Sequence, residues 1–317
     1  MLESNIRVDI LLATYNGEKY LEEQLDSIIN QTYKNWFVIV RDDGSSDLTL
    51  NIIEQFCKNY PDKSLFIKDS ESNLGPCFNF GKLLTYSTSN YIMFCDQDDI
   101  WLENKIELSL SGILKTERIY SKDLPILIHT DLKVVDSKLN MISESFFELK
   151  KLNPELSKNI NSIICDNSIT GCTMIINKSL KDKIIINNKN IIMHDWWIAI
   201  IACILGKIDV IYEPTILYRQ HSNNSIGISN NKKTLREKLK ISTLSRILNY
   251  EEKIQNQTKS FLDVYEKILN IDRNVLNILS AYSKFSSYTF FKKKYIRIKY
   301  SFFYRNFIKN LILLLIN

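Results

Sequence analysis

Short apolar runs and amphipathic segments alternate along the first third of the chain. The apolar runs have the length and the β-branched or aromatic content of strands, and they cover residues 8–13, 36–40, 65–67 and 91–95. Segments with apolar residues at helical spacing follow them, at 20–29, 48–60, 79–87 and 103–115. Because strand and helix alternate over so short a length, we predict an α/β fold with a parallel sheet and right-handed crossovers.

Polar motifs stand directly after three of these predicted strands. The motifs are Thr14-Tyr15-Asn16-Gly17, Asp42-Asp43-Gly44 and Asp96-Gln97-Asp98-Asp99. In an open α/β sheet, ligands gather beyond the carboxyl ends of the strands. We therefore expect the three motifs to line one crevice.

The motif at residues 96–99 places three carboxylates within four residues. Such groups repel one another, and a divalent cation with oxygen ligands holds them together at little cost in energy. Mg²⁺ or Mn²⁺ bound in this way usually carries a phosphate or diphosphate as a further ligand. The motif therefore favours a metal site for a nucleotide-linked substrate. The alternative is an acidic loop in which Asp98 or Asp99 caps the next helix.

Several short motifs also follow one another in a recognisable order. They lie at residues 13–17, 27–33, 42–47, 73–75 and 96–99, and a second group follows at 170–172 and 194–197. This order resembles that of the family 2 glycosyltransferases of the GT-A fold. The motifs at 96–101, 194–197 and 218–221 are similar to those of bacterial polysaccharide enzymes often classed as rhamnosyltransferases. The resemblance implies a GT-A domain with a mixed, largely parallel central sheet over residues 1–225, followed by a basic helical region at 226–317.

For the donor, the resemblance implies a nucleotide site at the ends of the first strands. Asp43 would accept a hydrogen bond from the base, while Asp42 supports the turn; a turn centred on Gly44 is the alternative. The other residues of this predicted site are Thr14, Tyr15, Asn16, Gly75 and Asp96. The resemblance also assigns the metal to Asp98, with Asp96 and His221 beside it. For His221 a role as an ordinary surface histidine is the alternative.

For the acceptor, the resemblance points to Asp195, just before the apolar segment 198–205. In inverting sugar transfer one carboxylate takes the proton of the acceptor hydroxyl as that oxygen attacks the anomeric carbon, and Asp195 matches the position of that base. A helix N-cap is its alternative role. Trp196 and Trp197 are expected either to stack on the acceptor sugar or to lie in the core. Arg219 is expected to balance the charge of the diphosphate.

Cysteine usage and the first residues bear on the cellular setting. The six cysteines form no C-x-x-C pair, and most lie in apolar runs, which argues against disulfides and structural zinc. The first residues lack a basic stretch followed by a long apolar one, and no segment approaches the ~20 apolar residues of a transmembrane helix. We therefore expect a cytoplasmic protein with reduced thiols.

Charge divides the chain into an acidic and a basic part. From residue 225 onward there are 18 Lys and Arg and 6 Asp and Glu, whereas the preceding residues carry 23 and 30. No acidic residue follows Asp272, and aromatic residues are mixed with cations at 290–300. This pattern favours a tail lying on the cytoplasmic face of the membrane, with a helical bundle packed on the main domain as the alternative. Nucleic acid is not expected as a partner, because no nucleic-acid motif accompanies the charge.

Together these observations predict a metal-dependent, inverting glycosyltransferase with Mg²⁺ or Mn²⁺ as cofactor. The resemblance favours dTDP-rhamnose as donor, with UDP-hexoses next, and a lipid-linked or polysaccharide acceptor in bacterial surface glycan synthesis. The competing interpretation is a non-catalytic nucleotide-sugar-binding or membrane-scaffold protein that retains the fold. The carboxylates at 43, 96, 98 and 195 argue against it.

Overall fold

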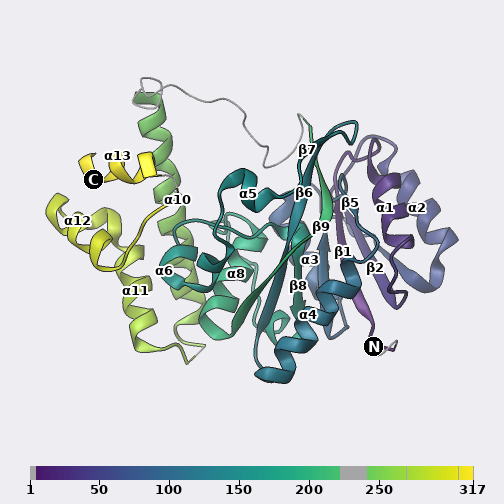
Figure 1. The fold of residues 1–317 in the computed structure, drawn as a ribbon, viewed down its shortest axis with the longest axis horizontal. Coiled ribbons are helices and arrows are strands. Elements are labelled where there is room, and N and C mark those ends of the chain that lie inside the picture. Colours follow the sequence, from purple (N-terminus) through teal and green to yellow (C-terminus); the bar gives the residue numbers. More distant parts are fainter. Residues whose placement is uncertain (1–4, 222–240, 269, 306, 317) are drawn as a thin grey trace.

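One mixed sheet forms the centre of the computed structural model, which describes residues 5–221, 241–268, 270–305 and 307–316 (Figure 1). Its strands are β1 (Val8–Thr14), β2 (Trp36–Asp42), β3 (Ser64–Ile67), β4 (Tyr91–Cys95), β5 (Ile100–Trp101), β6 (Ile126–Asp136), β7 (Met141–Ser143), β8 (Met174–Asn177) and β9 (Lys207–Gln220). They join in the order β3-β2-β1-β4-β8-β6-β9-β5, and β7 pairs with β6.

Most neighbouring strands in this sheet run parallel. The pairs β1–β2, β1–β4, β2–β3 and β6–β9 are parallel, whereas β8 runs antiparallel between β4 and β6. The short strands β5 and β7 pair antiparallel with β9 and β6. The predicted α/β fold with a mixed, largely parallel sheet is therefore confirmed.

Helices cover both faces of the sheet and form the end of the chain (Figure 1). They are α1 (Leu21–Ile29), α2 (Thr49–Asn59), α3 (Gly75–Tyr86), α4 (Lys105–Ile119), α5 (Phe146–Lys150), α6 (Ile160–Ile163), α7 (Lys178–Lys181), α8 (His194–Leu205), α10 (Ile241–Tyr265), α11 (Arg273–Ser283), α12 (Phe290–Lys299) and α13 (Phe307–Ile316). Within the described residues, no helix combines the length and the hydrophobicity needed to cross a membrane.

The strands hold the site rigidly because both faces of the sheet are buried. Successive side chains of a strand point to opposite faces. Ile10 and Leu12 of β1 belong to a hydrophobic cluster with α1, α2 and α4, whereas Leu11 belongs to a second cluster with α3, α8 and the C-terminal helices. All three side chains are fully buried. The carboxyl end of β1 is thereby fixed from both sides.

Two elements begin at other positions than the pattern predicts. α3 begins at Gly75 and not near 79, because Pro76 occupies the first turn, where a missing N–H costs nothing. The motif at 96–99 leads into β5, and α4 begins only at Lys105 after Asn104. The alternative in which Asp98 or Asp99 caps this helix is therefore wrong.

The C-terminal helices pack on the first part of the chain. The Trp197 ring on α8 lies 5.5 Å from that of Phe261 and 5.9 Å from that of Tyr265, both on α10. A buried ion pair joins Arg297 of α12 to Glu251 of α10. These helices therefore share one hydrophobic core with α3 and α8. The predicted domain boundary at residue 225 lies outside the described residues.

Candidate active site

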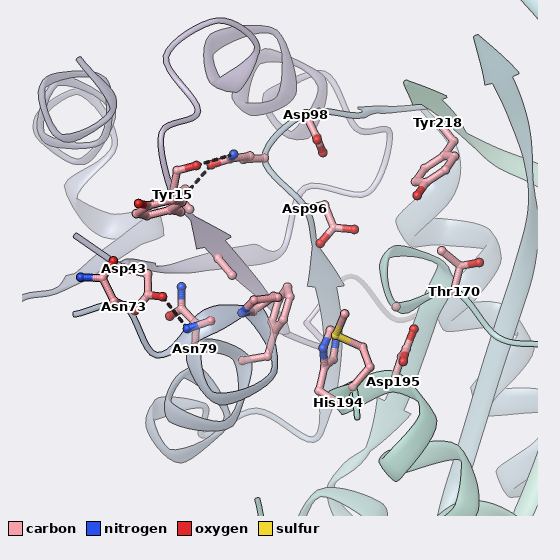
Figure 2. A pocket seen from close by; sticks show the side chains of 18 residues that line it. Tyr15, Asp43, Asn73, Asn79, Asp96, Asp98, Thr170, His194, Asp195 and Tyr218 are labelled. Carbon is pink, nitrogen blue, oxygen red and sulfur yellow. Dashed lines mark hydrogen bonds between the residues drawn. The ribbon is translucent and has the colours of Figure 1, made fainter. Parts of the chain in front are cut away.

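A cavity of about 420 Å³ opens where β1, β2 and β4 end (Figure 2). The structure brings seven of the predicted site residues to its wall: Thr14, Tyr15, Asp43, Gly75, Asp96, Asp98 and Asp195. The others are not among its lining residues: Asn16, Asp42, Trp196, Trp197, Arg219 and His221. The three polar motifs thus converge on one crevice, as their places after parallel strands predicted.

Asp43 is held at one end of the cavity by surrounding donors. Its Oδ1 accepts a hydrogen bond from the Leu74 amide at 2.9 Å, and its Oδ2 accepts one from the Gly75 amide at 2.8 Å. The fully buried Arg41 donates to Oδ1 at 3.2 Å and also pairs with Asp69. Gly75 has a φ of +77°, which a glycine adopts without strain. These contacts hold the Asp43 carboxyl group in a fixed position beside the crevice.

Asp42 and Asn16 hold the turns beside the cavity. Asp42 accepts hydrogen bonds from the Ser45 amide at 2.7 Å and from Thr14 Oγ1 at 2.9 Å. Asn16 Oδ1 accepts one from the Ser46 amide at 2.9 Å. These contacts agree with a turn-supporting role for Asp42. Neither Asp42 nor Asn16 is among the residues that line the cavity, and the predicted contact of Asn16 with a nucleotide stays a prediction.

The acidic motif after β4 forms a compact, partly buried cluster. One ligand-type atom each of Asp96, Asp99 and Cys172 lies within 4.8 Å of the others. Burial, together with the nearby charges of Asp98 and Asp195, raises the pKa of Asp96 to about 7. Asp99 is fully buried, and its Oδ2 has no hydrogen-bond partner among the described residues. Burial and mutual repulsion therefore make the carboxyl groups of Asp96 and Asp99 hold their protons more tightly than ordinary carboxyl groups do.

Asp98 lines the cavity next to this cluster, and a histidine accompanies it. His221 Nε2 lies 2.9 Å from Asp98 Oδ2, and the His221 ring packs on Tyr20 with centroids 4.9 Å apart. Carboxylate oxygens are the ligands that Mg²⁺ and Mn²⁺ prefer. Asp96 and Asp98 both point into the cavity (Figure 2), so the donor set fits such a cation.

Arg219 lies behind the metal motif and not at the cavity wall. Its side chain is only 2% exposed and forms an ion pair with Glu23. Its Nε donates to the Asp98 carbonyl at 2.9 Å, and its backbone amide donates to Asp99 Oδ1 at 3.1 Å. The expectation that Arg219 binds the diphosphate is therefore wrong, because its guanidinium is buried and holds the loop that carries Asp98.

Asp195 stands at the opposite end of the cavity, in the first turn of α8. It is 5% exposed, and burial raises its pKa to about 7, while hydrogen bonds from the amides of Trp196 and Gly171 and from Asn167 oppose that rise. Met193, and not Asp195, occupies the N-cap position. The N-cap alternative is therefore wrong, and burial leaves this carboxyl group with a pKa of about 7.

Trp196 and Trp197 lie in the core. They are 2% and 0% exposed. The indole N–H of Trp196 donates to the Ile163 carbonyl at 2.6 Å, and that of Trp197 donates to the Ile185 carbonyl at 2.9 Å. The expectation that this pair stacks on an acceptor sugar is therefore wrong, because both rings are covered by protein and their N–H groups are satisfied.

His194 lies at the cavity wall, although the sequence predicted no role for it. Its ring lies 4.1 Å from that of Phe80, and burial lowers its pKa to about 3, so it is neutral. A Cβ on Gly171 would come within 2.8 Å of His194 Nε2. The motifs at 170–172 and 194–197 are thus in contact, and this contact requires glycine at 171.

Other lining residues were given no role by the sequence, although Tyr218 begins the motif at 218–221. Asn79 and Phe80 lie in α3, and Tyr218 lies in β9. Asn79 accepts a hydrogen bond from the buried Arg41 at 3.0 Å. In the sequence Asn79 and Phe80 read as ordinary helix positions. Only their distance from the polar motifs in space marks them, and no spacing rule gives that distance.

A cavity at the carboxyl ends of parallel strands, lined by several carboxylates, is where an open α/β sheet binds its ligands. Solved glycosyltransferases of the GT-A fold are similar to this structure. The structure of S. aureus TarS in complex with UDP-GlcNAc has a TM-score of 0.58 at 17% identity, covering 89% of this chain and 73% of that one. The mannosyltransferase PcManGT of Pyrobaculum calidifontis, in complex with GDP-Man and Mn²⁺, has a TM-score of 0.52 at 13% identity, covering 94% and 74%.

Sequence comparison gives the family. The profile of glycosyl transferase family 2 matches residues 9–181. The dTDP-rhamnosyl transferase RfbG of Shigella flexneri is 32% identical over 228 residues, which is 68% of this chain and 73% of that protein. The chain therefore belongs to glycosyl transferase family 2, and the predicted GT-A fold is confirmed.

Proposed function

We propose that this protein is an inverting glycosyltransferase that moves a sugar from a nucleoside-diphosphate sugar to a lipid-linked or polysaccharide acceptor in bacterial surface glycan synthesis. One observation carries the proposal: carboxylates suited to three different tasks line a single cavity. Asp43 lies at one end, Asp96 and Asp98 lie between, and Asp195 lies at the other. A protein that only binds a nucleotide sugar would need Asp43, but it would have no use for a carboxylate at the position of Asp195.

The chemistry follows from the position and the pKa of Asp195. A carboxylate with a pKa near 7 is ionised in a useful fraction of molecules at neutral pH and is a stronger base than an exposed aspartate. It takes the proton of the acceptor hydroxyl as that oxygen bonds to the anomeric carbon. The bond from this carbon to the diphosphate breaks on the opposite face, so the configuration inverts. The proton remains on Asp195 until solvent removes it.

The leaving diphosphate needs compensation of its charge. Asp98, with Asp96 and His221 beside it, would hold Mg²⁺ or Mn²⁺, and such an ion stabilises the negative charge of a departing diphosphate. Arg219 serves this site indirectly, because it holds the Asp98 carbonyl and the Asp99 carboxylate in place. Asp43 and Tyr15 would hold the base, through a hydrogen bond and a stacking contact.

For the donor we propose dTDP-rhamnose, with UDP-hexoses next. The 32% identity to RfbG, over 68% of this chain, supports the first. The experiment is a thermal-shift screen of dTDP-rhamnose and UDP-hexoses with and without Mn²⁺, since a ligand that binds only the folded state raises its stability. The best ligand is then tested for sugar transfer to a polyprenyl-diphosphate-linked sugar. If no nucleotide sugar stabilises the protein, the proposal fails.

We also propose that the enzyme works at the cytoplasmic face of the membrane and attaches through α12. Phe291, Tyr295 and Ile298 are 80%, 61% and 63% exposed on this helix, and they recur at helical spacing with the exposed Lys292 and Lys299. We call these five residues the α12 face. Apolar groups flanked by cations suit the interface of an anionic bilayer.

The orientation of the α12 face is fixed by the opposite side of the helix. Ile296 and Arg297 point inward and are 7% and 1% exposed. Arg297 pairs with Glu251 and donates to the Phe302 carbonyl at 3.0 Å. The helix therefore has a buried side that belongs to the core and an exposed side with apolar and basic groups. Packing on the main domain and contact with a membrane are thus compatible.

A further inference from the structure

Gln97, the second residue of the acidic motif at 96–99, bridges two walls of the cavity. Gln97 Oε1 accepts a hydrogen bond from the Tyr15 amide at 2.8 Å, and Gln97 Nε2 donates one to the Tyr15 carbonyl at 2.9 Å (Figure 2). The two residues are 82 positions apart in the chain. The loop that carries Asp96 and Asp98 is therefore joined to the loop after β1 by one side chain.

The position of the Gln97 side chain also explains why residue 17, two positions after Tyr15, is a glycine. A Cβ on Gly17 would lie 2.3 Å from Gln97 Oε1 and 2.5 Å from its Cδ, distances that no real contact allows. The φ of Gly17 lies outside the left-handed region, so an alanine would suit its backbone. The glycine is thus required by the space that the glutamine side chain occupies. Its amide also donates to Thr49 Oγ1 at 2.7 Å, which limits how far the loop can retreat.

Tyr15 needs such a constraint because burial does not hold it. Its side chain is 49% exposed and lines the cavity. A loop residue with an exposed side chain keeps one position only where its backbone groups are bonded. Gln97 satisfies both backbone groups of Tyr15 at once, which a glutamate cannot do because an ionised carboxylate has no donor. Asparagine is one methylene shorter and would not reach in the same geometry.

We propose that Gln97 is a positioning residue for donor binding: it sets the place of Tyr15, and so of the wall that receives the nucleotide base, relative to the metal carboxylates on either side of it. This inference rests on the proposed function, since it presumes a nucleotide in this cavity. It assigns Gln97 no contact with the reacting atoms. Its loss should weaken recognition of the base and leave binding of a bare metal-diphosphate unchanged.

The test compares ligands with and without a base. UDP, dTDP and inorganic pyrophosphate, each with Mn²⁺, are titrated calorimetrically into the full chain. Gln97→Met keeps the length of the side chain and removes both hydrogen bonds. We expect it to weaken nucleoside-diphosphate binding by roughly tenfold, the scale of losing two neutral hydrogen bonds, while pyrophosphate binding is unchanged. The matched control is Gln55→Met on the exposed face of α2, which should change neither.

A double substitution separates positioning from general damage. Gly17→Ala alone should weaken nucleotide binding, because the new methyl group displaces Gln97. In the Gln97→Ala background, where that space is empty, the same Gly17→Ala change should have little further effect. Thermal unfolding of each variant shows whether the fold is retained.

The outcomes are distinct. If the parent binds pyrophosphate and neither nucleotide, the proposed function itself fails. If the parent binds a nucleotide and Gln97→Met binds it equally well, the bridge has no role in binding and the inference is overturned. Equal losses for pyrophosphate and nucleotide would overturn it also, since they would place the effect of Gln97 on the metal carboxylates. Additive effects of the two alanine substitutions would contradict the steric account of Gly17.

Discussion

His221 Nε2 lies 2.9 Å from Asp98 Oδ2, although 123 residues separate them. The sheet explains this proximity. The motif that carries Asp98 runs directly into β5, and β5 pairs antiparallel with β9, with Ile100 opposite Leu217. This pairing places the C-terminal end of β9 beside the loop after β4. His221 is the first residue after β9, so it lies next to Asp98. The donor set of the proposed metal site thus depends on a two-residue strand.

We expect Asp98→Asn to abolish metal-dependent turnover and leave the fold intact. The neutral amide cannot offset a cation's charge as a carboxylate does, so turnover should fall by about 10²-fold or more, and added Mn²⁺ should no longer raise nucleotide-diphosphate affinity. Titration of UDP or dTDP with and without Mn²⁺ measures the second effect. Asp62→Asn, an exposed position before β3 at the other edge of the sheet, is the control. If Asp98→Asn keeps metal-dependent turnover, Asp98 is not the metal ligand.

We expect Asp195→Asn to retain donor binding and lose sugar transfer by ~10²-fold or more, the usual scale for a general base. The pH dependence gives an independent check. Burial raises the pKa of Asp195 to about 7, and only the ionised form accepts a proton. The parent's kcat/KM should therefore fall as the pH falls below about 7 and level off above it, and protonation of Asp96, whose pKa is also about 7, adds to the fall. Equal losses of donor affinity and of rate in the variant would mean that Asp195 is structural.

Acid should destabilise the protein through His129 on β6. This side chain is fully buried, neither ring nitrogen has a hydrogen-bond partner among the described residues, and burial lowers its pKa from 6.5 to about 4. Between these values the unfolded chain binds more protons than the folded one, so stability is complete above pH 6.5 and falls as the pH falls toward 4.

The matching variant is His129→Leu, which cannot titrate. Relative to the parent, its free energy of unfolding should depend less on pH, by on the order of 3 kcal/mol between pH 7 and pH 4. Urea unfolding at several pH values measures this difference. His194, whose pKa is also lowered, remains in both proteins and so does not enter the comparison. Parallel stability curves for the two proteins would show that His129 is not the acid-sensitive group.

The sequence predicted the parts of the structure that local pattern determines. The strand at 91–95 matches β4 residue for residue, because a continuous apolar run bounded by Asn90 and Asp96 leaves no other end point. The meeting of three polar motifs followed from the rule on parallel strands. The start of α3 was missed, since Asn73-Leu74-Gly75-Pro76 reads equally well as a turn.

The sequence could not decide which way certain side chains face. Trp196 and Trp197 begin an apolar helix, and the same letters suit an exposed sugar platform or a core. Helix α10, about 60 residues later in the chain, decides the matter by covering Trp197 with Phe261 and Tyr265. Arg219 similarly faces Glu23 of α1, a partner that no local pattern indicates. Long-range packing, and not propensity, fixed both outcomes.

The last prediction concerns the α12 face. Replacing Phe291, Tyr295 and Ile298 by serine should release the protein from anionic liposomes, because these are the most exposed apolar side chains of α12. Lys292→Glu with Lys299→Glu should do the same by charge, since each cation near an anionic leaflet contributes about 1 kcal/mol. High salt should weaken binding of the parent. Substitution is preferable to removing residues from 286 onward, because Phe302 and Leu313 lie in the core.

Ile119→Ser, equally exposed on α4, is the control. Co-sedimentation with phosphatidylglycerol and phosphatidylcholine vesicles measures the partitioning, and nucleotide binding shows that the cavity is intact. If the parent shows no preference for phosphatidylglycerol at low salt, the α12 face is not a membrane-binding surface.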